Sequence, residues 1–285
     1  MVRALLVGTA LLGLAGAAVA QQAPADAPSS PPSPVSLRIK APEAHQGAAS
    51  DGTHVYAIDN DRIGKYRIAD GQRVAQWQGE RRLYPHMNSC TVVGTELVCA
   101  ASNYPAVPQT SAVEIFDTKT LKHVRSVSLG FGRGSLTVMD RHDGKWWAVF
   151  ANYEGKGGEP GRDYRYTLLV RMDDQFRQEA AWVFPAEVLA RFAPKSCSGM
   201  SWSKDGRLYV TGHDRPEIYE LALPEAGSTL ELRRTIGFAS PGQAIDWDPV
   251  KPGLLWSIDR ARNDMISRAW ISISLAWPWN PPEGW

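Results

Sequence analysis

Three of the six histidines stand beside short apolar segments. His45 precedes one such segment, His86 opens another and His213 follows a third. Three imidazoles with an open coordination position are the ligand pattern of a catalytic zinc ion. A carboxylate that could complete such a shell follows an apolar segment in three places, at Asp59, Asp214 and Asp259. The spacing carries no local ligand motif, so a divalent metal is one candidate cofactor among several chemistries.

The same histidines could act without a metal. A histidine beside Tyr104 or Tyr153 could serve as a general base while Arg133 or Arg260 holds a carboxylate, which suits proton abstraction or elimination. A third interpretation is that these polar side chains only hydrogen-bond to one another and to water. The candidate catalytic residues are His45, His86, His213 and Tyr104.

Cys197 is a further candidate, because His213 or Lys195 could activate its thiol as a nucleophile. A lone cysteine is more often an inert, buried apolar group. The other three histidines fall in turns or at strand edges, where an isolated imidazole has no partner to tune it, and we expect them to be structural. They are His54, His123 and His142.

A segment pattern that recurs five times must position these residues. Each copy has a short apolar strand, a tight turn, a second apolar strand and then a polar residue. The copies begin at His45, His86, Arg133, Cys197 and Gly242. Repeats of about 40 to 50 residues built from four short strands are typical of a β-propeller. The sequence therefore predicts an all-β, five-bladed β-propeller with four-stranded antiparallel blades.

The last blade lacks a convincing fourth strand. The segment VSLRIK at 35–40 precedes the first copy just as RRTIGF precedes the fifth, so we predict that it closes the last blade as its outer strand. This assignment makes 35–274 a single propeller domain. A tail at 275–285 with three Trp and three Pro then lies outside the ring.

Strand direction predicts where the polar residues gather. Residues before the first strand and after the second strand of each copy emerge on one face, and the Asp-Gly turns emerge on the other. We expect the first face to bind a small polar, carboxylate-bearing molecule at the channel mouth. The turn face contains residues that any hairpin would use, so we expect no site there. The candidate ligand-binding residues are Gln46, Asn60, Asn88, Asn103, Arg133, Asn152, Tyr153, Asp214, Gln243, Asp259 and Arg260.

The first two cysteines can be paired from the register of a hairpin. In NSCTVVGTELVC the two-residue turn Gly94-Thr95 places Cys90 directly opposite Cys99, at a pair whose Cα separation suits a disulfide. An oxidising compartment would favour that bridge. The alternative is two buried free thiols.

The N-terminal segment predicts export. Arg3 is followed by an apolar run that ends in Ala18-Val19-Ala20, so we expect 1–20 to be a signal peptide and the protein to be periplasmic or secreted. Residues 21–34, rich in Pro, Ala and Ser, are predicted to be a disordered linker. No later run reaches the roughly 20 apolar residues of a membrane span.

The balance of acidic and basic residues limits the classes of partner that the protein can bind. Removing Arg3 with the signal leaves 30 basic and 30 acidic residues, since the whole chain has 31 and 30. This balance excludes the basic footprint of a nucleic-acid-binding protein. We expect a monomer whose partner is a small molecule.

Several segments resemble a family of exported bacterial β-propellers, some of whose members are labelled cycloisomerase-like. They include AIDNDRIGKY, DRHDGKWW, LVRMDDQF and LYVTGHD, and the resemblance spans about 41–260. Plant-type glutaminyl cyclotransferases are similar in opening a blade with a Gln-Gly pair, here Gln46-Gly47. Their acidic blade openings are not matched at Ser89, Ser135 or Gly199. Lactonase-type propellers are similar only in that Asn103, Asn152 and Asp259 suit their metal ligands.

Two functional hypotheses follow. In the first, the protein is an isomerase, lyase or lactonase-type enzyme, or one similar to a glutaminyl cyclotransferase. In the second, the same mouth binds a glycan, peptide or metabolite without altering it. Fold alone does not separate them, because propellers serve many functions.

Overall fold

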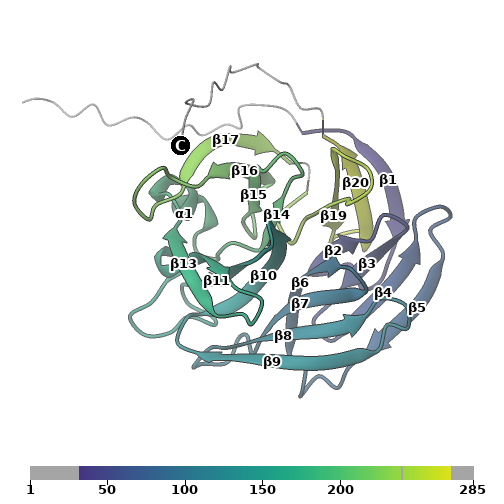
Figure 1. The fold of residues 1–285 in the computed structure, drawn as a ribbon, viewed down its shortest axis with the longest axis horizontal. Helices are drawn as coiled ribbons and strands as arrows, with labels where there is room; N and C mark the ends of the chain where they lie inside the picture. Colours follow the sequence, from purple (N-terminus) through teal and green to yellow (C-terminus); the bar gives the residue numbers. More distant parts are fainter. Residues whose placement is uncertain (1–31, 239, 271–285) are drawn as a thin grey trace, which may run out of the picture.

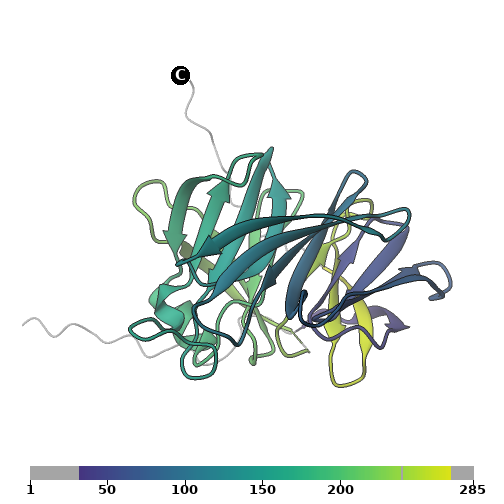
Figure 2. The ribbon, with the colours of Figure 1, turned by 90° about the horizontal axis from the view of Figure 1, so that it is seen from below.

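The computed structural model describes residues 32–238 and 240–270. They form five four-stranded antiparallel sheets arranged as blades around a central channel, which confirms the predicted propeller (Figure 1). Turned by 90°, the ring is seen from the side, with its strands running between two faces (Figure 2). The described residues include no helix long and apolar enough to cross a membrane.

The strands of each blade follow one another from the channel outward, except in the last blade. Blade 1 comprises β2 (Gly47–Ser50), β3 (His54–Ile58), β4 (Arg62–Arg67) and β5 (Arg73–Gln78). Blade 2 comprises β6 (His86–Val93), β7 (Glu96–Ser102), β8 (Thr110–Asp117) and β9 (His123–Phe131). Blade 3 comprises β10 (Ser135–His142), β11 (Lys145–Ala151), β12 (Leu168–Met172) and β13 (Gln178–Val183).

Blade 4 comprises β14 (Gly199–Trp202), β15 (Leu208–Thr211), β16 (Glu217–Ala222) and β17 (Glu231–Gly237). Blade 5 comprises β18 (Asp246–Trp247), β19 (Leu254–Asp259), β20 (Asp264–Ala269) and β1 (Val35–Lys40). One short helix, α1 (Ala186–Phe192), follows blade 3, and η1 (Tyr164–Tyr166) is a 3-10 turn in the loop between β11 and β12.

The N-terminal strand closes the ring. Strand β1 pairs antiparallel with β20, as predicted, although the two are separated by more than two hundred residues (Figure 1). The carbonyl of Ser33, just before β1, also accepts a hydrogen bond of 2.6 Å from Arg268 Nη1. The last blade is therefore held by both ends of the described chain.

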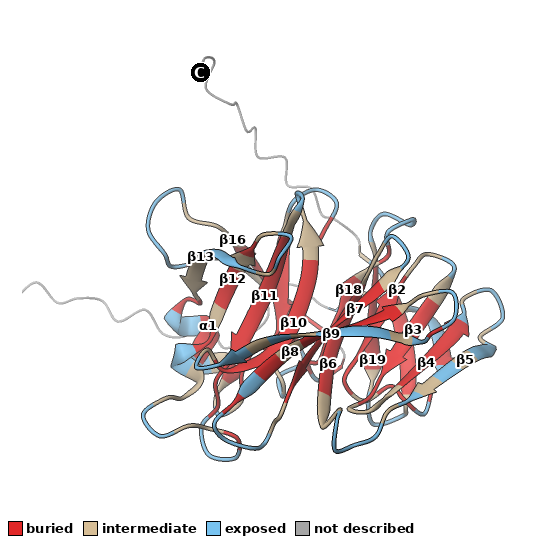
Figure 3. Ribbon diagram, turned by 60° about the horizontal axis from the view of Figure 1, so that its bottom comes forward, coloured by how far each residue is buried: buried red, intermediate tan, exposed pale blue. Residues whose placement is uncertain are grey.

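Each of the five apolar clusters of the core lies between two neighbouring blades. Successive side chains of a strand point to opposite faces, so one strand serves two clusters. In β7, Leu97 and Cys99 pack toward blade 1, whereas Val98 and Ala100 pack toward blade 3. Figure 3 shows the consequence, with inner strands buried along most of their length and the outer strands β5 and β9 largely exposed.

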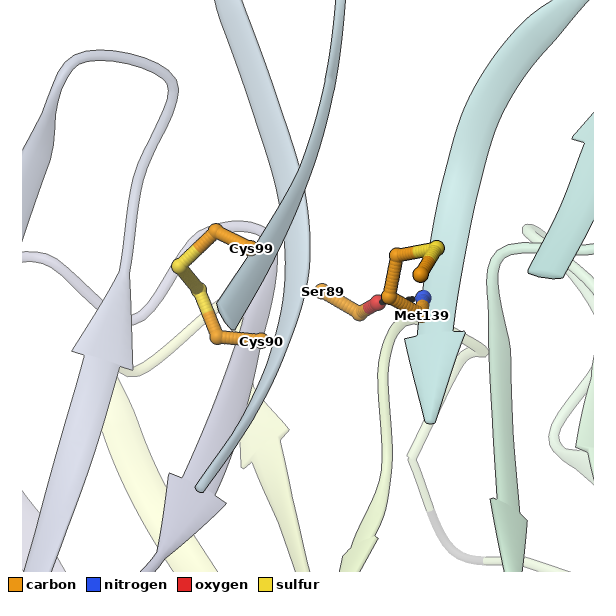
Figure 4. The surroundings of a disulfide bond; sticks show 4 residues. All are labelled: Ser89, Cys90, Cys99 and Met139. Carbon is orange, nitrogen blue, oxygen red and sulfur yellow. Dashed lines mark hydrogen bonds between the residues drawn. A yellow bond between two sulfur atoms is a disulfide. The ribbon is translucent and has the colours of Figure 1, made fainter. Parts of the chain in front are cut away.

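The predicted disulfide is present in this core. Cys90 and Cys99 face each other across β6 and β7 and are bonded, with their Cα atoms 4.0 Å apart (Figure 4). Their turn has Gly94 at φ 60, which the first position of a type II′ turn requires. Beside them, Met139 of β10 donates its backbone N–H to Ser89 Oγ at 3.3 Å, which ties blade 3 to blade 2.

The residue pattern of the repeat predicts that the inner strands of the second and fifth copies span 89–93 and 244–247, and the structure differs at both. Strand β6 begins at His86 rather than at Ser89, because an irregular register between Met87 and Cys90 lets the pairing continue beyond the bulge. Strand β18 has only two residues, whereas we expected it to begin at Ala244. Ala244 lies close to Gly47, where an added Cβ would be 2.4 Å from the Ala244 Cβ, so small residues are required at this end of the channel.

Candidate functional site

The face predicted to bind a ligand carries a continuous row of polar and aromatic contacts at the channel end. His86 Nδ1 lies 2.5 Å from Asn60 Oδ1, and the His86 ring lies 5.0 Å from that of Tyr104. The Tyr104 ring lies a further 5.0 Å from that of Tyr153. We call this end the His86 mouth and define it by His86, Asn60, Tyr104, Tyr153 and Arg260.

The tautomer of His86 follows from its partner. Asn60 donates its amide Nδ2 to Asp59 Oδ1 at 3.1 Å, so its Oδ1 faces His86 and can only accept. Nδ1 of His86 therefore carries the hydrogen, and in the neutral ring Nε2 carries the lone pair. Burial lowers the pKa of His86 to about 4, and the charges of Arg81 and Arg260 act in the same direction. The ring is neutral at physiological pH.

Two arginines on this face lack an ion-pair partner among the described residues. Arg260 and Arg133 form no ion pair with any residue in the described ranges; Arg133 packs over the ring of Phe150 at 5.5 Å. Arg81 has only a 3.9 Å contact with Asp61. The Arg260 guanidinium lies close enough to His86 to lower its pKa, and a guanidinium without an ion-pair partner among the described residues favours an anionic ligand.

Tyr153 is the most buried ring of the mouth. Tyr153 is 8% exposed, and burial raises the pKa of its hydroxyl above the usual range. Next to it, Asn152 donates Nδ2 to the carbonyls of Arg133 and Tyr166, while its Oδ1 is buried and has no hydrogen-bond partner among the described residues. This carbonyl oxygen is available to a ligand or an ordered water.

Two of the three candidate histidines have other partners. His45 contacts Asn263 Oδ1 at 2.9 Å and Asp59 Oδ2 at 3.1 Å, which anchors blade 1 to the last turn of blade 5. His213 lies 2.6 Å from its neighbour Asp214. Across residues 32–238 and 240–270, no three His, Cys, Asp or Glu side chains are arranged to hold a metal ion. The three-histidine metal hypothesis therefore finds no support in this geometry.

Several other predicted ligand-binding residues hold the fold together. Asn103 closes its own loop, donating Nδ2 to the Pro108 carbonyl and accepting from the Thr110 N–H. Asn88 donates to the Leu136 carbonyl of blade 3, at 3.0 Å.

Two more of the predicted ligand-binding residues, in blades 5 and 1, also form contacts within the fold. Asp259 forms ion pairs with two exposed arginines: Arg38 of β1, which holds β1 against blade 5, and Arg262 of the turn that follows β19. Gln46 donates to Asn60 Oδ1 at 3.2 Å and so supports the acceptor of His86.

Gln243 stands out for its backbone. It adopts φ 138, a region that only glycine enters readily, and its carbonyl accepts from Thr211 Oγ1 at 2.7 Å. This bond joins blade 4 to blade 5 at the His86 face. Strain of this kind persists only where the surroundings enforce it.

Cys197 is fully buried in the cluster between blades 3 and 4. Burial raises the pKa of its thiol to about 12, and its Sγ donates to the Gly199 carbonyl at 3.4 Å. A neutral, enclosed thiol is not a nucleophile, so Cys197 is a core residue.

The turn face holds a cavity that the sequence did not predict. Its volume is about 780 Å³, and it is lined by residues of the inner strands β10, β14 and β18 and of the turns beyond them. We call it the turn-side pocket and define it by Asp140, Trp202, Asp246, Trp247 and Trp270.

Two buried carboxyls at this pocket have perturbed acidities. Burial raises the pKa of Asp140 to about 6. Burial, and then repulsion from Asp140 and Asp248, raises the pKa of Asp246 well above its usual value. Each carboxyl also links two blades, since Asp140 Oδ2 accepts from the Trp202 N–H at 2.7 Å and Asp246 Oδ2 from the Ser50 N–H at 2.8 Å. Perturbed carboxyls that line a cavity mark a candidate site.

Aromatic rings form the rest of the pocket wall. Tyr209, Trp247 and Trp270 contact one another edge to face, with centroid separations of 5.3 to 5.6 Å. His142 stacks on Trp202 at 4.3 Å, so this histidine packs against an aromatic wall. The indole nitrogens of Trp202 and Trp247 are buried and have no hydrogen-bond partner among the described residues. Sequence reasoning missed this site because its aspartates resemble ordinary ends of strands.

Comparison with known proteins identifies the fold only. No protein family profile matches the chain, and no curated protein matches it. The PQQ-bound aldose sugar dehydrogenase of Streptomyces coelicolor is similar in structure with a TM-score of 0.52 and 8% identity, over 83% of this chain and 98% of that one.

Two further solved structures are similar at lower scores. The β-propeller domain of Cps50 (Swd1) from Myceliophteria thermophila has a TM-score of 0.47 and 13% identity, over 84% of this chain and 99% of that one. A luciferin-regenerating enzyme has a TM-score of 0.48 and 10% identity, over 81% of this chain and 94% of that one. Likeness at these scores carries no argument about this chain.

Proposed function

We propose that this protein is an exported β-propeller that binds a small carboxylate-bearing molecule at the His86 mouth. The observation that carries the proposal is that Arg133 and Arg260 lack ion-pair partners among the described residues and lie on the face where His86 is held neutral. An arginine fork matches a carboxylate in shape and charge. Export rests on the predicted signal peptide, which lies outside the described residues.

The remaining groups of the mouth suit the rest of such a ligand. The Tyr104 and Tyr153 rings offer flat apolar surface, and the unpaired Asn152 Oδ1 can accept one hydrogen bond. His86 adds a pH dependence, because a bound carboxylate would favour the charged imidazolium and raise the pKa of His86 above 4. Affinity is then expected to increase as pH falls from neutrality toward 5.

Isothermal titration with benzoate and succinate, against the neutral compounds benzamide and succinamide, tests this proposal. The carboxylates should bind and their amides should not. Arg260→Ala should weaken binding by about tenfold, the equivalent of one charge-assisted hydrogen bond. Arg233→Ala is the matched control, since Arg233 lies on the outer strand β17 and is paired with Glu231. Equal binding of the amides, or equal loss in both variants, would overturn the proposal.

The enzyme hypothesis now depends on His86. His45 and His213 are engaged by neighbouring carboxylates, whereas neutral His86 hydrogen-bonds to side-chain amides, those of Asn60 and Asn88. A pKa near 4 makes this imidazole a weak base until an anion binds beside it. Incubating a carboxylate that binds, followed by mass spectrometry, distinguishes an isomerase or lyase from a binding protein. A product that His86→Ala fails to form would establish catalysis.

A further inference from the structure

The turn-side pocket has the size and walls of a small-molecule site. Its volume of about 780 Å³ falls in the range of ligand cavities. It lies at the opposite end of the inner strands from the His86 mouth, so the proposed carboxylate site does not account for it.

The aromatic wall favours a positively charged guest. Tyr209 comes from β15, Trp247 from β18 and Trp270 from the residue after β20, so three separate segments bring their rings together. The faces of such rings carry negative electrostatic potential, which attracts an ammonium group within about 6 Å. Trp202, stacked on His142, adds a further indole to the lining.

The charged residues that line the cavity also favour a positively charged ligand. Four aspartates line it, namely Asp140, Asp205, Asp246 and Asp248. Its cations are fewer. Arg141 is paired with Asp174 and packs over Trp146, which leaves Lys204 as the other cation of the lining. An anion would be repelled here, whereas a cation would relieve the repulsion between Asp140 and Asp246.

A bare metal ion suits the cavity less well than an organic cation. Oxygens of Asp248 are already used by Ser50 Oγ, by Trp256 Nε1 and by the backbone of Val250 and Lys251. No set of three ligating side chains exists among the described residues. The wall instead offers rings, which hold alkylated nitrogen through their faces.

We propose that the turn-side pocket binds a small organic ammonium ion, held against the rings of Trp247 and Trp270 and balanced by the carboxyls of Asp140 and Asp246. This proposal is independent of the carboxylate site. A carboxylate ligand for the His86 mouth and an ammonium ligand for this pocket can each be found or refuted alone.

Titration calorimetry of the full chain with choline tests the proposal, with 3,3-dimethylbutan-1-ol as an analogue of the same shape but without charge. We expect choline to bind at pH 8 at least tenfold more tightly than the alcohol. At pH 5, where Asp140 is protonated, choline binding should weaken by about tenfold, the effect of one lost charge. The groups that face Asp140 and Asp246 are Asp248, Asp205, Lys204, Arg141 and His142, and the alcohol titration at both pH values controls for their titration.

Three variants locate the effect. Asp140→Asn should remove the pH dependence of choline binding, and Trp247→Leu should weaken choline at least tenfold at pH 8. Asp70→Asn, in an exposed turn of blade 1, is the matched control. If Asp140→Asn does not fold, Asp205→Asn at the exposed rim of the pocket replaces it and should weaken choline at pH 8.

Equal affinity for choline and the alcohol would overturn the proposal and indicate a neutral ligand that accepts from the indole N–H groups. Absence of choline binding, or an equal loss in Asp70→Asn, would also overturn it.

Discussion

The two ends of the channel are built from the same inner strands but have opposite chemistry. At the His86 mouth, a neutral imidazole lies near Arg260, which has no ion-pair partner among the described residues. At the turn-side pocket, coupled carboxyls lie among indole rings. The difference arises because the first end exposes loops that follow the second strand of each blade, while the second end buries side chains inside the inner strands. One scaffold can therefore present an anion site and a cation site.

The two ends also respond to acid in opposite directions. Folding lowers the pKa of His86 from 6.5 to about 4, so the unfolded chain binds a proton there first and stability falls as pH drops through this interval. Folding raises the pKa of Asp140 from 3.8 to about 6, so the folded chain binds a proton first and stability rises as pH drops through nearly the same interval. The two effects offset each other in the native protein.

The largest effect that we predict follows from replacing His86. Without its titration, the pH dependence of the unfolding free energy should show the contribution of the pocket carboxyls. In His86→Gln, the loss of stability between pH 6.5 and 4 should disappear, a change of about 3 kcal/mol in the difference between the two pH values. The variant should then become more stable on acidification, as Asp140 and Asp246 bind protons. Urea unfolding at pH 7 and pH 4.5 measures the free energy of unfolding at each pH. If the variant loses as much stability on acidification as the native protein does, His86 and Asp140 do not act in opposite directions.

Replacing Asp140 should do the reverse over a slightly narrower interval. Asp140→Asn removes the gain of stability between pH 6 and 4, about 3 kcal/mol for a group this buried. Its unfolding free energy should fall on acidification, because His86 still titrates. The same urea series applies, with Asp70→Asn as a control that leaves the slope between pH 4 and 6 unchanged.

The smallest predicted effects come from backbone strain at the two ends of the channel. Gln243 holds φ 138 at the His86 face, so Gln243→Gly should relieve strain and raise the unfolding free energy by about 1 kcal/mol. Gly206, in the turn beside the pocket, has φ 76 with open space around its missing side chain. Gly206→Ala should therefore lower stability by about 1 kcal/mol through backbone strain alone. Thermal melts of both variants would show opposite shifts; a loss of stability in both would contradict strain at Gln243.

The fold was predictable because its signals are local and repeated. Turn pairs such as Gly94-Thr95 fix the register of a hairpin, and register alone placed Cys90 opposite Cys99. The closing strand at 35–40 was recognisable because the same kind of segment precedes other copies of the repeat. The start of β6 was predicted incorrectly because a bulge between Met87 and Cys90 leaves no signature in residue types.

The site was less predictable than the fold. Topology places His86, Tyr104 and Tyr153 on one face, and they do contact one another. Topology does not show that the Asn103 side chain hydrogen-bonds within its own loop, to the Pro108 carbonyl. The pocket was missed for a related reason, since Asp140 lies inside β10 and Asp246 begins β18, where residue type alone does not show that a carboxyl is buried.

The pairing of β1 with β20 also affects the order in which the chain can fold. Blades 1 to 4 are each continuous in sequence and can form as the chain emerges from the ribosome. The ring cannot close until β20 is available to pair with β1, so the earliest strand of the fold must wait for one of the last before it finds its partner.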